Sequence, residues 1–294
     1  MEARFIEHGY EFIPTHRNVR KKLAKSALFN YTIIWIWQQR SKFHWGEKMR
    51  LLENLYCYIW QGKGNNSNSY LFAGVLRGDR PHVLIDPGHE VNELRERCLD
   101  HLLGSMERDG LKPEDIGLII NTHSHPDHCE ANQALVERSR ARTGKPKQAL
   151  IALHEDEEGY RRVLGGIMAR MLGRGVAFEP NFYLKEGDLN LGKEKKLNIT
   201  VLHTPGHSPG SISLYWPDNR VLITGDLLFY GGVGRTDLPG GDGKLLKQSI
   251  ERLSELDIEY LLPGHSTEYG SIIKGEDKVK QNFSFVRLNY FPML

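Results

Sequence analysis

The sequence lacks the features that several classes of protein depend on. Its three cysteines, Cys57, Cys98 and Cys129, are widely spaced, which excludes a CxxC motif and a disulfide framework. No uninterrupted apolar run reaches the roughly 18 residues of a membrane-spanning helix. The net charge of +2 over 294 residues argues against a dedicated polyanion binder. We therefore expect a cytoplasmic protein with reduced thiols, no membrane span and no nucleic-acid partner.

The first 48 residues differ in composition from the rest, with nine Lys or Arg against four Asp or Glu. A basic run, Arg17–Lys25, precedes an apolar patch, Ala27–Trp37, which is the order found in secretory signals. No small-x-small cleavage site follows the patch. We therefore expect residues 1–48 to be a basic extension, either disordered or a short surface helix, before a globular domain at 49–294. A translational start at Met49 is an alternative.

From Leu51 onward, short segments of branched and aromatic residues alternate with turns and amphipathic segments. This pattern predicts strands at residues 51–60, 69–73, 82–86, 116–122, 150–153, 197–203, 211–216, 220–224 and 259–262. It predicts helices at 129–142, 159–172, 244–256 and 276–288, and one more in which Leu94, Cys98, Leu102 and Met106 recur every four residues. Two such halves predict two sheets packed together with helices outside.

The strongest chemical signal is the segment His123-x-His125-x-Asp127-His128, which follows the apolar strand predicted at 116–122. A loop there can turn His123 and His125 toward one point and Asp127 and His128 toward a neighbouring one. Imidazole and carboxylate groups suit zinc, iron or manganese. Four such residues within six positions predict a metal site rather than an ordinary polar loop.

Three later residues strengthen this prediction, because each stands where a predicted strand meets a turn. His207 lies in Thr204–Gly210, Asp226 follows Gly225, and His265 follows Gly264. Glycine beside a ligand permits a close approach of the backbone. Most other histidines, His154 among them, lack this context and are expected to be surface or hydrogen-bonded residues. His203 lies near a motif and could support a ligand.

These residues, with Asp86, occur in the order found in the metallo-β-lactamase superfamily, which the sequence resembles from about Leu51 to Ser271. The resemblance implies an α+β fold, an αββα sandwich of two mixed β-sheets flanked by helices, with the catalytic domain at 49–294. It implies that one metal ion is held by His123, His125 and His207. Asp127, His128 and His265 would hold a second ion, and Asp226 would bridge both. Asp86 would be a buried carboxylate that orients the loop and is not a ligand.

The implied cofactors are two divalent metal ions, with zinc expected and iron or manganese as alternatives. Two close ions can share a hydroxide and stabilise an oxyanion. The catalytic residues would then be Asp127 and Asp226. Cys129 adjoins His128, but nothing marks it as a nucleophile, and we expect it to pack beneath the loop.

The stretch from Gly225 to Asp242 resembles the glyoxalase II branch of the superfamily. Arg235 falls where that branch places a cationic substrate-binding residue, and it could bind the carboxylate of a thiol conjugate. Alternatively, Arg235 pairs with Asp237 and shapes the loop. Tyr230 could line the substrate pocket or serve in packing. Only 29 residues follow His265, too few for the helical domain of full hydroxyacylglutathione hydrolases, which makes glutathione specificity doubtful.

We therefore predict a hydrolase that uses a metal-bound hydroxide on a small acyl thioester, with a thioester or thiol conjugate as its small-molecule partner. The alternative is a persulfide dioxygenase of the same fold, with one non-haem iron held by His123, His207 and Asp226. The presence of every second-site residue favours hydrolysis. The acyl group, the thiol carrier and the oligomeric state stay open.

Overall fold

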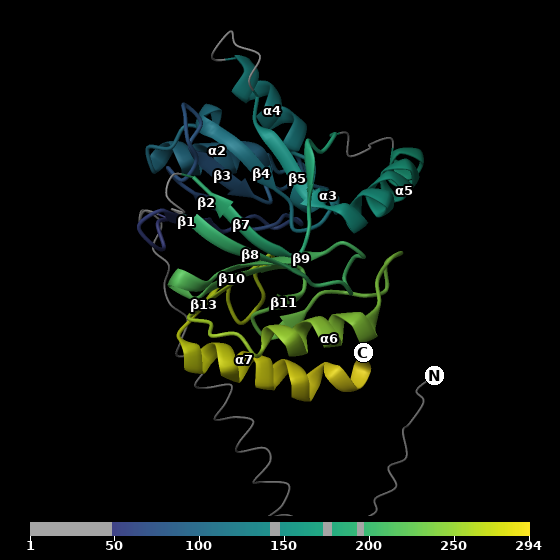
Figure 1. Cartoon of the computed structure of the whole chain (residues 1–294). Helices are drawn as coiled ribbons and strands as arrows, with labels where there is room; N and C mark the ends of the chain where they lie inside the picture. The colour runs from purple at the N-terminus through teal and green to yellow at the C-terminus, as the bar shows by residue number, and fades with distance from the viewer. Residues whose placement is uncertain (1–48, 142–147, 173–177, 193–196) are drawn as a thin grey trace, which may run out of the picture. The chain divides into compact units, whose positions relative to one another are not determined.

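The structure is a computed structural model that describes residues 49–141, 148–172, 178–192 and 197–294. The predicted N-terminal extension, residues 1–48, lies outside these residues. The described residues all belong to one compact unit, which Figure 1 shows as two sheets stacked between layers of helices.

Each sheet has six strands among the described residues, and each combines parallel with antiparallel pairing. The first sheet, in spatial order, consists of β1 (Leu55–Tyr58), β2 (Ser69–Phe72), β3 (His82–Ile85), β4 (Ile116–Ile120), β5 (Leu150–His154) and β6 (Phe182–Leu184). The second consists of β14 (Ile273–Lys274), β13 (Tyr260–Pro263), β10 (Val221–Gly225), β9 (Ile212–Trp216), β8 (Leu197–His203) and β7 (Gly187–Leu191). A small hairpin pairs β11 (Leu228–Phe229) with β12 (Gly232–Val233). The predicted mixed α+β sandwich is confirmed.

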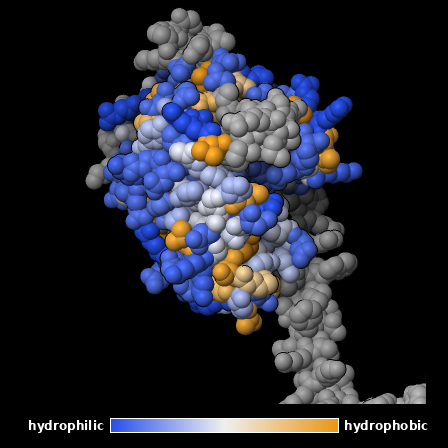
Figure 2. All heavy atoms as spheres, turned by 90° about the vertical axis from the view of Figure 1, so that its right-hand side faces the viewer, coloured by the Kyte–Doolittle hydropathy of each residue, from blue (hydrophilic) through white to orange (hydrophobic). Residues whose placement is uncertain are grey.

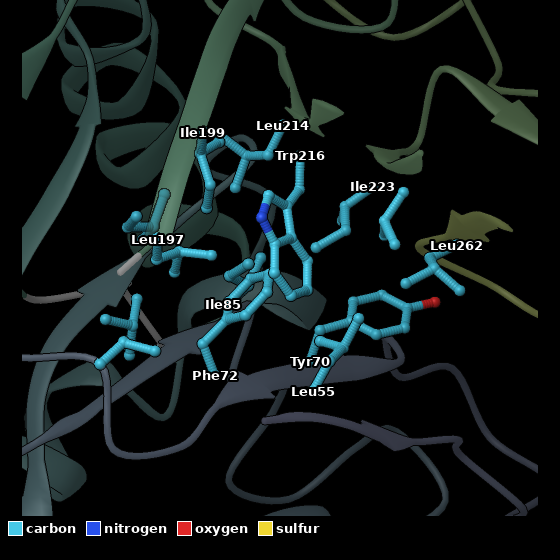
Figure 3. Packing of buried hydrophobic residues seen from close by; sticks show 14 of the residues in the cluster. Leu55, Tyr70, Phe72, Ile85, Leu197, Ile199, Leu214, Trp216, Ile223 and Leu262 are labelled. Atoms are coloured by element: carbon cyan, nitrogen blue, oxygen red, sulfur yellow. The ribbon is translucent and has the colours of Figure 1, made fainter. Parts of the chain in front are cut away.

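The main hydrophobic core lies between the two sheets, where apolar side chains of both inner faces meet (Figure 3). Phe72 on β2 and Trp216 on β9 contact each other across this layer, with ring centroids 5.4 Å apart in a T-shaped arrangement. Both residues are nearly fully buried, and burial of each such side chain stabilises the fold by about 1.5–3 kcal/mol. This contact is part of the core between the two sheets whose edges carry the candidate ligands.

Helices cover the outer face of each sheet. The helices after the strands of the first sheet are α2 (Cys98–Arg108), α3 (Pro126–Cys129), α4 (Asn132–Ala141) and α5 (Glu155–Leu172). Those associated with the second are α6 (Gly243–Leu253) and α7 (Glu276–Asn289). Single 3₁₀ turns occur at Pro113–Asp115, Pro217–Asn219 and Phe291–Met293. Two further cores fill the helix–sheet layers, one under α2 and α4 and the other under α6 and α7.

The predicted helix that included Leu94 is partly wrong. Helix α2 begins at Cys98, and Leu94 lies before it with 56% of its surface exposed. The Asn92 side chain accepts hydrogen bonds from the backbone N–H groups of Leu94 and Glu96, at 3.1 and 2.9 Å. Arg95 adopts a φ of 61°, which a helical residue does not. A turn that is closed by hydrogen bonds to the Asn92 side chain therefore takes the place of the predicted first turn of the helix.

The surface in Figure 2 is mostly hydrophilic, and its hydrophobic residues form small separate groups. Within the described residues, no helix is both long enough and apolar enough to cross a membrane. The three cysteines are free, as the sequence predicts, and all three are buried.

Candidate metal centre

Strand pairing brings the candidate ligands to one edge of the sandwich. In the first sheet, β3 and β4 run parallel, so Asp86 and the segment after Ile120 leave the same edge. In the second, β10 and β13 run parallel, and Gly225 pairs with Pro263, which places Asp226 close to His265. His207 lies in the connection between β8 and β9. A backbone hydrogen bond from Ile212 to the Thr122 carbonyl, 2.9 Å long, joins the two sheets at this edge.

The first group of candidate ligands consists of His123, His125 and His207. Their ligand atoms all lie within 4.8 Å of one another, and His125 Nδ1 is 2.8 Å from His207 Nε2. The side chain of His123 is buried, and its Nε2 atom has no hydrogen-bond partner. A buried nitrogen without a partner is costly in a folded protein. A metal ion at this point would satisfy it.

The second group consists of Asp127, His128 and His265, whose ligand atoms again lie within 4.8 Å of one another. His265 Nε2 is 3.2 Å from Asp127 Oδ2 and 3.2 Å from His128 Nε2. Asp226 lies between the two groups. One of its oxygens is 3.2 Å from His128 Nε2, and the other is 3.3 Å from His265 Nε2 and 3.7 Å from His207 Nε2. All seven predicted ligands therefore converge in one cluster.

Close backbone approach shapes this cluster, as the glycines in the sequence predict. A Cβ atom on Gly264 would lie 2.3 Å from Asp226 Oδ1 and 2.8 Å from His128 Cε1. Gly225 has a φ of 49°, and a Cβ there would lie 2.5 Å from Thr122 Oγ1. A side chain at Gly264 would push a candidate ligand out of place, and one at Gly225 would displace Thr122, which precedes His123.

Four of the candidate histidines have a contact at the ring nitrogen that faces away from the centre of the cluster. His123 Nδ1 contacts Thr122 Oγ1 (3.1 Å), His125 Nε2 contacts Tyr160 Oη (2.9 Å), His207 Nδ1 contacts the Arg235 carbonyl (2.8 Å), and His128 Nδ1 contacts Asp86 Oδ2 (2.9 Å). Such outer contacts fix the ring orientation of metal-binding histidines. The nitrogens left facing the centre are those expected of ligands, so the residues present fit a metal ion.

Asp86 is buried and stands outside both groups, in the role that the resemblance implies. Its carboxylate accepts hydrogen bonds from the backbone N–H and the hydroxyl of Thr122, at 2.8 and 2.7 Å, besides its contact with His128. Its φ of 51° is unusual for a residue other than glycine. The strained backbone holds this carboxylate beneath the loop from His123 to His128.

The electrostatics of the two groups differ. Burial, reinforced by the neighbouring imidazoles, lowers the pKa of His123 well below its usual value and that of His125 to about 4. Burial also opposes the charged form of His265, but Asp226 and Asp127 outweigh it and raise its pKa to about 10. For Asp226, burial is outweighed by His265 and His128, and the pKa falls well below the usual value. His123 and His125 are thus neutral imidazoles beside an ionised carboxylate.

The two predicted substrate-binding residues lie in different surroundings. The Arg235 side chain is 60% exposed, and its guanidinium donates two hydrogen bonds to Asp237, at 2.8 and 2.7 Å. This ion pair is the alternative that the sequence left open. Tyr230 stacks in a tilted arrangement on Tyr269, with ring centroids 6.3 Å apart. The ring of Phe229, next to Tyr230 in the sequence, lies 6.0 Å from the ring of His265.

Sequence reasoning missed three residues that contact the cluster or its loops. Asn65 donates a hydrogen bond to Asp127 Oδ2 (2.7 Å), and Tyr160 contacts His125. Glu157 is fully buried and binds Ser124, between His123 and His125. The sequence does not single out Glu157, because the residues beside it are also acidic. Its burial is visible only in the structure.

The histidines outside the motifs are engaged elsewhere. His154 and His203 stack with ring centroids 4.2 Å apart and, with Asp156, form a further cluster of metal-ligand type. His154 Nδ1 accepts from the Asp156 N–H (3.3 Å), and His203 Nε2 bonds the Pro209 carbonyl (2.9 Å). One ring nitrogen of each of these two histidines is therefore hydrogen-bonded within the protein.

A polar pocket of about 400 Å³ borders the second group. Its lining combines one loop with the residues around a candidate ligand: Trp60, Gly62, Lys63, Gly64, Asn65, Asn66, His265 and Ser266. Its volume falls in the range of small-molecule sites. The loop is held in place by hydrogen bonds from the backbone N–H groups of Lys63 and Gly64 to Glu96, at 3.0 and 2.7 Å.

Comparison with known proteins identifies a family. Residues 62–265 match the sequence model of the metallo-beta-lactamase superfamily. A probable metallo-hydrolase of Methanocaldococcus jannaschii is 33% identical, covering 77% of this chain and 96% of its own. Hydroxyacylglutathione hydrolase GloC of Haemophilus influenzae is 30% identical, covering 68% and 86%. The human acyl-coenzyme A thioesterase MBLAC2 is 32% identical, covering 71% and 76%.

Solved structures agree with this result. A protein crystallised in a di-iron-bound form is 31% identical, with a TM-score of 0.55 over 78% of this chain and 95% of its own. ETHE1 from Myxococcus xanthus is 24% identical, with a TM-score of 0.53 over 81% of this chain and 83% of its own, which is a likeness of fold alone.

Proposed function

The chain belongs to the metallo-beta-lactamase superfamily, and from this premise we propose that it is a metal-dependent hydrolase of small acyl thioesters, of the glyoxalase II type. The superfamily binds divalent metal ions, and this chain carries the histidine and aspartate clusters for them. We propose two ions, with zinc as the metal. The proposed ligands are His123, His125 and His207 for one ion, and Asp127, His128 and His265 for the other, with Asp226 bridging.

The observation that carries the proposal is the convergence of two complete ligand groups at Asp226. A site with a single ion, as in the dioxygenase alternative, would not require Asp127, His128 and His265 to meet within 4.8 Å. When bound, two ions would supply a hydroxide nucleophile at neutral pH and polarise the carbonyl of the substrate. The chain's own residues hold and orient the ligands, and Asp86 fixes His128 against the centre.

The substrate class rests on the relatives and on the pocket. Two relatives at 30% and 32% identity bear names that describe the hydrolysis of acyl thioesters. The polar pocket beside His265 has room for a small acyl conjugate. We propose that Arg235 binds an anionic group of the substrate and that Tyr230 borders the same region. Because Asp237 occupies the Arg235 guanidinium, substrate must compete with this carboxylate.

The test is metal analysis of the purified protein together with two assays. We expect two equivalents of metal and hydrolysis of hydroxyacylglutathione or acyl-coenzyme A thioesters. The parallel assay measures oxygen consumption with a persulfide. One equivalent of iron, oxygen consumption and intact thioesters would replace the hydrolase by the dioxygenase.

A further inference from the structure

Glu157, in the first turn of α5, is a buried carboxylate that the proposed chemistry does not use. It has no exposed surface, and its oxygens accept four hydrogen bonds. Oε1 accepts from the backbone N–H and the hydroxyl of Ser124, at 2.9 and 2.7 Å. Oε2 accepts from the Ser208 hydroxyl and the Gly210 backbone N–H, both at 2.8 Å. A buried carboxyl group with four hydrogen-bond donors around it is costly to assemble, which indicates a specific task.

These donors belong to the two segments that carry one group of candidate ligands. Ser124 stands between His123 and His125, and Ser208 follows His207. The backbone of α5 also approaches closely here, since a Cβ atom on Gly210 would lie 2.2 Å from the Glu157 nitrogen. Glu157 therefore joins two loops, from different sheets, that must meet for the three histidines to face one point.

Tyr160 extends the same contact by one helical turn. Residues three apart lie on the same face of a helix, so Glu157 and Tyr160 face the loops together. The Tyr160 hydroxyl is 2.9 Å from His125 Nε2, and the rings are 5.9 Å apart. Both contacts reach the group of three histidines. The outer contact of His128 in the second group comes instead from Asp86.

We propose that Glu157, assisted by Tyr160, is a positioning residue that sets the affinity of the three-histidine group for its metal ion and leaves the second group largely unaffected. This inference rests on the proposed metal-binding function of these residues. It deepens that function by assigning to α5 the joining of the two loops that carry the three histidines.

The carboxylate is required for a geometric reason. Each oxygen of Glu157 accepts one backbone N–H, and a backbone N–H cannot turn away as a hydroxyl can. An amide has a single oxygen, so Glu157→Gln leaves the N–H of either Ser124 or Gly210 facing another donor, whichever way the amide is turned. One of the two loops is then released. Loss of such an outer contact typically weakens metal binding by about 10- to 100-fold.

The experiment measures metal stoichiometry and affinity by chelator competition in the full chain. A His265→Ala background, which disables the second group, isolates the first ion. We expect Glu157→Gln to lower the affinity for this ion by about 10- to 100-fold. In the otherwise unaltered chain, the same substitution should leave one ion tightly bound and release the other. Cobalt-loaded protein should show a changed visible spectrum that represents one site only.

Glu158→Gln is the matched control. Glu158 is the next residue of α5 and pairs with Arg161, at 2.8 and 3.0 Å, rather than with the metal loops. This variant should bind both ions as the wild type does. Tyr160→Phe, which removes one hydroxyl, should weaken the first ion in the same direction by a smaller factor. If Glu157→Gln does not fold, Ser208→Ala replaces it as the test variant, because this substitution removes one donor to Glu157 and keeps the backbone.

Equal weakening of both ions, or lower thermal stability of the metal-free protein with unchanged affinities, would overturn the inference and make Glu157 a general structural residue. The same effect in Glu158→Gln would overturn it too. Failure of the thioesterase assay, with selective loss of the first ion intact, would refute the proposed reaction and leave the inference standing. Absence of metal binding by the wild type would refute both.

Discussion

The pairing of Arg235 with Asp237 offers the sharpest test of substrate recognition. The side chain of Arg235 is exposed, whereas its backbone carbonyl accepts a hydrogen bond from His207 Nδ1 at 2.8 Å. Changing the side chain therefore leaves the backbone contact with the metal centre in place. The hydrogen bond from Arg235 lowers the pKa of Asp237 to about 2, so this carboxylate competes with an anionic substrate at any ordinary assay pH.

Two substitutions separate a substrate contact from a loop-shaping pair. If Arg235 binds the substrate, Arg235→Ala removes a charge-assisted bond of about 1.5–3 kcal/mol, and KM should rise roughly 10- to 100-fold. The value of kcat should change little, because the contact is made equally in the ground and transition states. Arg235→Lys should recover only part of the loss, because it lacks the two-pronged geometry.

Asp237→Asn should change KM in the opposite direction. It frees the guanidinium, and KM for an anionic thioester should fall, by no more than about fivefold because exposed ion pairs are weak. Steady-state kinetics with an anionic and a neutral thioester provide the assay, and the neutral substrate is the control. If both substitutions raise KM alike, or affect both substrates equally, Arg235 shapes the loop and does not bind the substrate.

Four further predictions concern the metal centre and the domain boundary. Asp226→Ala should abolish most activity and release metal, and Asp226→Asn should be nearly as damaging because a neutral amide bridges poorly; two bound ions with normal turnover in either variant would contradict the assignment. Asp86→Asn should weaken the second ion by about 10- to 100-fold, measured by chelator competition, because an amide has one oxygen and cannot accept from both His128 Nδ1 and the Thr122 backbone N–H, which bond different oxygens of Asp86. Removal of metal by a chelator should lower Tm in calorimetry, since ions that bind the folded state stabilise it; an unchanged Tm would count against a site that forms part of the fold. A chain that begins at Met49 should fold and bind metal, and an insoluble or metal-free product would place residues 1–48 in the core.

The sequence pattern was sufficient for most of the architecture because its buried strands are short apolar runs bounded by turn residues. β3, β4, β8 and β10 all lie within their predicted ranges or within one residue of them. The edge strands β6, β7 and β14 were not predicted, because β6 and β14 have only three and two residues and β7 is largely exposed. The hairpin of β11 and β12 is too short for any periodicity.

The seven candidate ligands could also be recognised from sequence, since each follows a predicted strand and the order is specific to a family. Their convergence depends on pairing that no local pattern contains: parallel β10 and β13 place Asp226 beside His265. The same is true of Glu157, which is one acidic residue among four in the first turn of α5.

Only the tertiary structure decides which of these carboxylates is buried, because burial depends on the packing of α5 against loops from both sheets. It also places Asp237 within hydrogen-bond distance of the Arg235 guanidinium, a pairing that the sequence offered as one of two alternatives. The residue types therefore specify which atoms could bind metal or substrate. The long-range packing specifies which of these atoms meet. Hydrogen bonds and electrostatic contacts act over a few ångströms in space, and the separation of two residues in the sequence does not give their distance in space.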